Sequence, residues 1–214
     1  VSDWPRRIDS RTLGCITSVL SKISAIPAST GLNDLSVIGS GKPLWGNAKE
    51  GWNETIVSFA ERRSDQFADL WRRDVSDFDI RRDALFSRVL DLPEIELRLV
   101  HGDICPENIL VDEQLRPVAL VDFGFLTFVG DPLFDAAVTS CITDMWGPYA
   151  QAHETQICAE LSIQMPGFSD RAELYKGLYG LITSNAYDPT GNDAQYEFCV
   201  NLMRRAQMTE FLGL

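Results

Sequence analysis

The feature that most constrains this chain is a pair of segments, residues 99–112 and residues 121–124. Within them Asn108 follows Asp103 by five residues, and Asp122 follows Asn108 by fourteen. Asn108 and Asp122 each stand at one end of a short apolar run that contains β-branched residues, and Asp103 lies three residues after Val100. Such runs predict strands with functional side chains at their ends.

The two segments predict a β-hairpin. Residues 108–112 and 117–122 are short apolar runs, and the polar residues 113–116 between them are typical of a turn. We expect two buried strands that bring Asp103, Asn108 and Asp122 toward one another. The simpler alternative is that these residues only form turns around Pro106 and Gly124, since Asp, Asn, Pro and Gly are common in turns.

The combination of two carboxylates and an amide suits phosphoryl transfer. That reaction needs an aligned acceptor hydroxyl and neutralised phosphate charge, and little covalent chemistry from the protein. Asp103 could accept the hydroxyl proton, while Asn108 and Asp122 could hold Mg²⁺, which prefers oxygen ligands and keeps part of its water shell. The spacing therefore favours a nucleotide-dependent phosphotransferase over a set of unrelated turns.

Three motifs resemble a known family. His101-Gly-Asp-Ile-Cys-Pro-Glu-Asn-Ile-Leu, Asp122-Phe-Gly and Gly130-Asp-Pro-Leu-Phe-Asp are similar to those of the aminoglycoside phosphotransferase and choline kinase group, relatives of the protein kinases. The resemblance implies that Asp103 is the catalytic base and that Asn108 and Asp122 bind magnesium. It also implies that His101 and Asp135 support the catalytic loop from behind.

Two departures distinguish the chain from protein kinases. Cys105 stands where protein serine/threonine kinases carry a lysine that neutralises phosphate charge. Only five residues, 125–129, separate the Asp-Phe-Gly motif from Gly130, which leaves no room for an activation loop. A small-molecule kinase is therefore favoured. A zinc site is not, because His153-Glu-Thr-Gln lacks the second histidine of the zinc-binding motif.

Part of the kinase machinery is not evident in the sequence. A kinase needs a glycine-rich hairpin over the phosphates and a strand lysine. Before His101 the only lysines are Lys22, Lys42 and Lys49, and none lies in an alternating apolar strand. Gly39-Ser-Gly-Lys-Pro departs from a phosphate-binding loop at both ends and lacks its strand-to-helix context. We expect a single kinase-like C-terminal lobe over residues 1–214, with a linker remnant at 1–10 and without the N-terminal nucleotide lobe.

The rest of the chain predicts helices, so the expected fold class is α+β and mainly α. An apolar stripe marks residues 11–26, which Pro27 ends, and Asn53 could cap a helix to about residue 63. Residues 28–47 are expected to form a loop, residues 97–100 a strand, and Asp131 with Pro132 is a favourable helix start. The remaining expected helices are residues 65–73, 77–90, 132–145, 152–164, 169–186 and 193–211.

Composition limits the partners. The 214 residues carry a formal net charge of −12, which disfavours nucleic acid and suits a cationic ligand. No apolar run is long enough to cross a membrane, and the N-terminus does not look like a signal peptide. The five cysteines are odd in number, widely spread and free of Cys-x-x-Cys pairs, so we expect reduced thiols in a cytoplasmic protein.

The acceptor pocket cannot be assigned to residues from the sequence. The resemblance places it among the late helices and the loop before the catalytic strand, and most of the carboxylates and aromatic rings there are expected to be solvated or core residues. The candidates are Asp144, Glu154, Glu160, Asp188, Asp193, Glu197, Trp45, Trp52, Trp146 and Tyr149.

These observations predict the catalytic lobe of a small-molecule kinase. It would transfer the γ-phosphoryl group of ATP or GTP to a hydroxyl of an amino-bearing metabolite or antibiotic. Aminoglycosides are the first expectation, with choline-like, homoserine-like, macrolide and amino-sugar acceptors open. The competing prediction is a non-catalytic binding or regulatory remnant, and upstream sequence encoding a glycine-rich hairpin and a strand lysine would argue against it.

Overall fold

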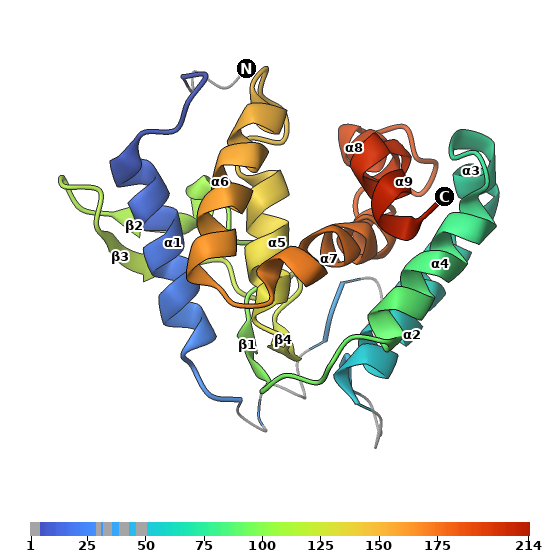
Figure 1. Cartoon of the computed structure of the whole chain (residues 1–214), viewed down its shortest axis with the longest axis horizontal. Helices are drawn as coiled ribbons and strands as arrows, with labels where there is room; N and C mark the ends of the chain where they lie inside the picture. Colours follow the sequence, from blue (N-terminus) through green and yellow to red (C-terminus); the bar gives the residue numbers. More distant parts are fainter. Residues whose placement is uncertain (1–4, 29–30, 32–35, 39–42, 46–50) are drawn as a thin grey trace.

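Helix α7 (Phe168–Thr183) lies at the centre of the computed structural model, which describes residues 5–28, 31, 36–38, 43–45 and 51–214 (Figure 1). The other described helices are α1 (Ser10–Ser24), α2 (Trp52–Asp65), α3 (Ala68–Asp74), α4 (Phe78–Leu90), α5 (Leu133–Ile142), α6 (Ala150–Gln164), α8 (Ala194–Arg204) and α9 (Ala206–Leu212). The described strands are β1 (Arg98–Val100), β2 (Ile109–Val111), β3 (Pro117–Leu120) and β4 (Phe128–Gly130), with a short 3₁₀ turn, η2 (Pro106–Asn108). The expected α+β, mainly helical class is confirmed.

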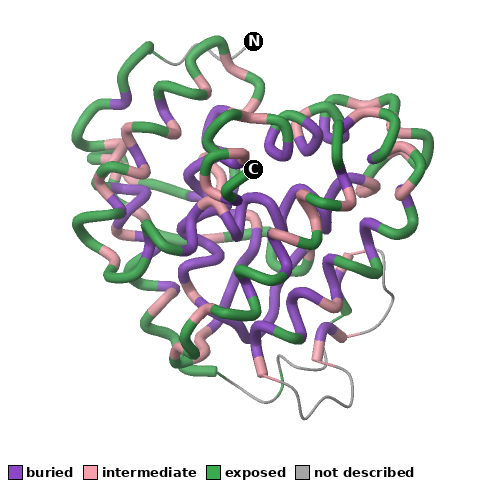
Figure 2. Tube along the Cα trace, turned by 45° about the vertical axis from the view of Figure 1, so that its right-hand side comes forward, coloured by how far each residue is buried: buried purple, intermediate pink, exposed green. Residues whose placement is uncertain are grey.

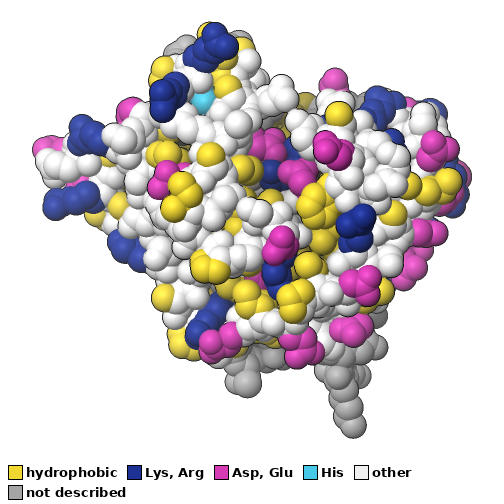
Figure 3. Space-filling model, viewed as in Figure 1, with side chains coloured by type: hydrophobic (Ala, Val, Ile, Leu, Met, Phe, Trp, Pro, Cys, Tyr) yellow, Lys and Arg dark blue, Asp and Glu magenta, His cyan; other side chains and the backbone are white. Residues whose placement is uncertain are grey.

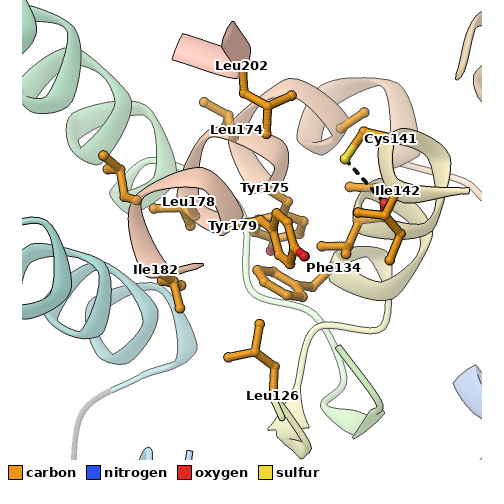
Figure 4. Close-up of a cluster of buried hydrophobic side chains, with 14 of the residues drawn as sticks. Leu126, Phe134, Cys141, Ile142, Leu174, Tyr175, Leu178, Tyr179, Ile182 and Leu202 are labelled. Atoms are coloured by element: carbon orange, nitrogen blue, oxygen red, sulfur yellow. Dashed lines mark hydrogen bonds between the residues drawn. The ribbon is translucent and has the colours of Figure 1, made fainter. Parts of the chain in front are cut away.

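The core is built around α7, which packs against α5, α2 and α8. Buried residues run through the centre of the chain trace while the outer helix faces are exposed (Figure 2). Aromatic rings dominate the middle of this core: Phe134 of α5 lies 5.6 Å from Tyr175 of α7, centroid to centroid, and Tyr179 lies nearby (Figure 4). Because large aromatic side chains bury much apolar area, this contact joins α5 firmly to α7.

Helix α1 forms as the apolar stripe predicts. Asp9 caps it, accepting hydrogen bonds from the backbone N–H groups of Arg11 (2.9 Å) and Thr12 (2.8 Å). The helix ends at Ser24, two residues before the predicted end, and the following segment bridges to β1 through Pro27 and Arg98. The stripe residues within the helix are buried except Leu13, which is partly buried.

Two small antiparallel sheets present the polar loops. Strand β1 pairs with β4, with Leu99 opposite Val129, and β2 pairs with β3, with Ile109 opposite Leu120. Strand β4 was not predicted, because its three residues, Phe128–Gly130, are too short for an alternating pattern to show. Pairing with β1 stabilises it and also fixes the entry to α5.

The expectation that both hairpin strands are buried is wrong. The hairpin β2–β3 forms, but Leu110, Val111 and Val118 are exposed, and Val118 keeps 65% of its surface. Only one face of the hairpin packs against α1, and an apolar run cannot by itself show that the other face is uncovered.

The predicted N-cap of α2 is also wrong. Helix α2 begins at Trp52 with Gly51 as its cap residue and without a side-chain cap hydrogen bond. The Asn53 amide instead donates to the carbonyl of Leu92 at 2.8 Å, which ties α2 to the end of α4. Asn53 therefore donates to a distant backbone carbonyl and does not cap its own helix.

The single helix expected at residues 193–211 is two helices, because the backbone is extended at Arg205 (ψ 150°). The Arg205 guanidinium reaches Glu154 of α6 (2.9 Å) and Glu173 of α7 (2.6 Å), and Lys176 joins the same network. These side chains line a cavity of about 550 Å³. Figure 3 shows a hollow in which acidic and basic side chains lie close together. These ion pairs compensate for the interrupted helix.

Several predictions concern residues outside the described ones. They include residues 39–42 of the Gly39–Pro43 segment, and so Lys42, together with Lys49. Most of the loop expected at 28–47 is also outside the described residues. No helix in the described ranges is both long and apolar enough to cross a membrane. All five cysteines are free thiols.

Candidate active site

The two polar segments meet beside the β2–β3 hairpin. Asp103 lies in the loop between β1 and η2, and Asn108 is the last residue of η2. Asp122 follows the strand β3, and its neighbour Val121 donates a backbone hydrogen bond to the Asn108 carbonyl at 3.0 Å. The hairpin register therefore places the Asp-Phe-Gly motif next to Asn108, as the sequence predicted.

Asn108 is held directly against Asp103. Its amide nitrogen donates to the Asp103 backbone carbonyl at 2.9 Å and to the carboxylate Oδ2 at 3.2 Å. Because the nitrogen is used in this way, the oxygen Oδ1 is the atom of Asn108 that remains to bind a cation.

The His101 ring contacts both the Asp103 loop and the end of the β2–β3 hairpin. It is fully buried, and its Nδ1 accepts a hydrogen bond from the Asp103 backbone N–H at 3.2 Å. The proton of the neutral ring therefore lies on Nε2, which donates to the carbonyl of Val121 at 3.0 Å. Burial lowers the pKa of His101, which favours this neutral form.

Asp135, in the first turn of α5, holds the start of the loop. Its carboxylate accepts from the backbone N–H of His101 (2.9 Å) and of Gly102 (2.6 Å). Complete burial raises the pKa of Asp135 to about 7, against the opposing effect of these two hydrogen bonds. Both His101 and Asp135 contact the loop that carries Asp103, and their supporting roles stay a prediction.

Gly102 allows this loop to pass close to Leu126. Its φ of 79° lies in the left-handed region, and an added Cβ would stand 2.3 Å from the Cβ of Leu126. Replacing Gly102 by alanine should therefore displace the loop and destabilise the fold by about 2 kcal/mol or more. Denaturant unfolding measures this loss, and Gly14→Ala is the control, since an added Cβ there meets nothing within 4 Å.

Two supporting residues were missed from the sequence. The hydroxyl of Thr127 accepts from the N–H of Gly124 (2.8 Å) and lies 3.3 Å from the His101 carbonyl, to which it donates. Phe123 places its ring edge on His101, with centroids 4.4 Å apart. A threonine and a phenylalanine in a short loop carry no signal that separates such contacts from ordinary packing.

Asp131 plays a larger part than the helix cap predicted for it. It does accept from the N–H of Leu133 (2.8 Å) at the start of α5. It also pairs with Arg171 (2.9 Å) and accepts from the Tyr175 hydroxyl (2.6 Å), both on α7. This fully buried group fixes the strand β4 and the start of α5 to the central helix.

Asp103 is partly buried and lies near other negatively charged side chains. Burial raises the pKa of the Asp103 carboxyl, and Asp122 and Glu107 raise it further, while His101 and Asn108 oppose the change. A carboxylate with a raised pKa in such a site can accept a proton more readily than an exposed one.

Asn108 and Asp122 offer suitable donors for Mg²⁺, an amide oxygen and a carboxylate. Among the described residues no group of three or more His, Cys, Asp or Glu side chains could hold a metal ion. A cation at this hairpin would thus need further oxygen ligands, such as phosphates and water.

The other candidate acceptor residues have mostly structural partners. Asp144 pairs with buried His153 at 2.9 Å, and Asp193 caps α8. Trp45 donates to the carbonyl of Val129 at 2.8 Å, and Trp52 is buried and donates to Tyr175 at 3.1 Å. Exposed surface remains on Glu197, Trp146 and Tyr149.

A protein family model and several solved structures are similar to this chain. The model of the APH phosphotransferase enzyme family matches residues 20–162, which is more than half of the chain. Three solved structures of a thermostable mutant of aminoglycoside phosphotransferase APH(4)-Ia match at 21% identity. Two of them are ternary complexes, one with ADP and hygromycin B and one with AMP-PNP and hygromycin B. For each of the two, the match covers 98% of this chain and 67% of the solved chain, with a TM-score of 0.64. The apo form covers 99% and 67%, with a TM-score of 0.62, and no curated protein matched the sequence.

Proposed function

Because this chain belongs to the phosphotransferase enzyme family, we propose that it forms the catalytic and acceptor-binding lobe of a small-molecule kinase. The substrates would be ATP or GTP and a hydroxyl on an aminoglycoside-like or other amino-bearing molecule. The observation that carries the proposal is the contact of Asn108 with both the backbone and the carboxylate of Asp103, in a loop braced by His101 and Asp135.

Asp103 is the proposed catalytic base. As the acceptor oxygen attacks the γ-phosphorus, its proton passes to the Asp103 carboxylate, the bond from the γ-phosphorus to the bridging oxygen breaks, and the nucleoside diphosphate leaves. The hydrogen bond from Asn108 holds the carboxylate in place during this transfer, and the bond that the Asp103 backbone N–H donates to His101 holds the backbone of the same residue. Mg²⁺ held by Asn108 and Asp122 would neutralise phosphate charge when bound.

A nucleotide lobe outside these residues is also part of the proposal. A kinase needs a strand lysine on the phosphates, and the strands that the structure describes contain none. We therefore expect no turnover from the 214 residues alone, and turnover of ATP or GTP when they are joined to such a lobe. A screen of amino-bearing acceptors with the full-length protein tests this. If the joined protein transfers no phosphoryl group, the non-catalytic remnant is favoured.

The metal assignment has its own test on the isolated chain. We expect a weak calorimetric signal for magnesium in the wild type and its loss in Asp122→Ala, because one of two protein ligands is removed. Glu113→Ala is the matched control, since it removes an exposed carboxylate from the turn of the same hairpin. Identical titrations for wild type and Asp122→Ala would contradict the site.

A further inference from the structure

A stacked aromatic pair, Phe125 and Tyr187, lies beside the segment that carries Asp122 and has no part in the chemistry proposed above. The ring centroids are 6.4 Å apart and the planes are 16° from parallel. Phe125 comes three residues after Asp122 and packs partly against the core, whereas Tyr187 keeps 70% of its surface exposed. One ring therefore supports the other while leaving it open to a ligand.

The loop that carries Tyr187, between α7 and α8, is held on both sides of the ring. Before it, the Asn185 amide donates to the side chain of Gln66 in the segment between α2 and α3, at 2.8 Å. After it, the backbone N–H of Asp188 donates to the Asp193 carboxylate at 2.9 Å. These bonds order the loop before any ligand arrives, so little conformational entropy is lost when Tyr187 contacts one.

The surroundings of Tyr187 carry negative charge. Burial and then the charges of Asp103, Asp193 and Asp122 raise the pKa of Tyr187, which agrees with the stacking of its ring on Phe125, three residues after Asp122. An aromatic face with carboxylates beside it attracts a cation, because the ring quadrupole and the negative charges act in the same direction.

We propose that Tyr187, supported by Phe125, is a specificity-determining residue that binds a cationic amine or ammonium group of the acceptor beside Asp103. This inference rests on the proposed function and names the feature of the acceptor that the site selects. A cation on the ring would orient the acceptor so that a hydroxyl of the same molecule faces the Asp103 carboxylate. An uncharged polyol would lack this contact.

Binding without nucleotide tests the inference. The 214-residue chain is titrated by NMR with hygromycin B, with tetramethylammonium and with uncharged trehalose, and the Tyr187 ring signals are assigned by comparison with Tyr187→Phe. We expect saturable shifts of these signals with a cationic probe and none with trehalose. Tyr187→Ala should weaken binding by about 3- to 30-fold and Tyr187→Phe by less than about twofold, since phenylalanine keeps the ring face.

Ile163→Ala is the control, because it removes another exposed apolar side chain, one on α6 that keeps 81% of its surface exposed and has no proposed role. The inference is overturned if neither cationic probe shifts the Tyr187 signals, or if Tyr187→Ala binds as tightly as the wild type. Neither result depends on turnover, so both differ from a failure of the phosphotransferase proposal. A full-length protein that binds the amine through Tyr187 but transfers no phosphoryl group would refute only that proposal.

Discussion

Replacing Asp103 by alanine is expected to reduce phosphoryl transfer by about 10²- to 10⁴-fold in the full-length protein, the range that a positioned general base contributes. Nucleotide affinity should stay nearly unchanged, because the proposed ligands of the phosphate-bound cation are Asn108 and Asp122. Steady-state turnover and a separate nucleotide titration measure the two effects. The same base assignment predicts that wild-type turnover falls on acidification at a higher pH than an exposed carboxylate would give, since burial raises the pKa of Asp103.

Glu107→Ala is the matched control for this variant. Glu107 is exposed, lies four residues from Asp103 and also acts on its pKa, so its loss removes a nearby negative charge but not the base. We expect turnover within about threefold of wild type. Turnover of Asp103→Ala at a comparable level would refute the base assignment, whatever the acceptor.

The largest loss of stability is expected from Asp131→Ala. This variant removes the buried partner of Arg171, whose side chain is only 6% exposed, and leaves the Tyr175 hydroxyl and the Leu133 N–H without their acceptor. Breaking a buried ion pair from one side costs about 3–5 kcal/mol in the free energy of unfolding. For a chain of this size that lowers Tm by roughly 10 °C, which calorimetry or thermal circular dichroism can measure.

An exposed ion pair with the same nitrogen–oxygen distance provides the comparison. Arg72 and Asp79 are also 2.9 Å apart, but about half of each side chain is exposed. Asp79→Ala should lower the free energy of unfolding by about 1 kcal/mol or less, because solvent screens the pair. Equal losses in the two variants would show that the Asp131 network does not hold β4 and α5 to α7.

Local sequence patterns determined most of the helices and the hairpin. The stripe of α1, the Asp131–Pro132 start of α5 and the turn between β2 and β3 all depend on residues close together in the chain. Such signals are readable because helix and strand periods, caps and turn residues act over a few positions. Two of the failures, at Asn53 and Arg205, occurred where a distant partner outweighed the local preference.

In the candidate active site, too, local sequence and distant contacts determined different features. The sequence by itself determined that Asp103, Asn108 and Asp122 belong together, because their spacing matches both the chemistry and a hairpin. Only the tertiary structure decided how that loop is held, through Asp135 from α5 and Thr127 near β4, and which aromatic ring stacks on Phe125 after the Asp-Phe-Gly motif. Tyr187 is far from Phe125 in the chain, and their contact follows from the packing of α7, for which no local pattern exists. Hydrogen bonds and ring contacts between distant segments depend on the completed core, so they become visible only once the chain has folded.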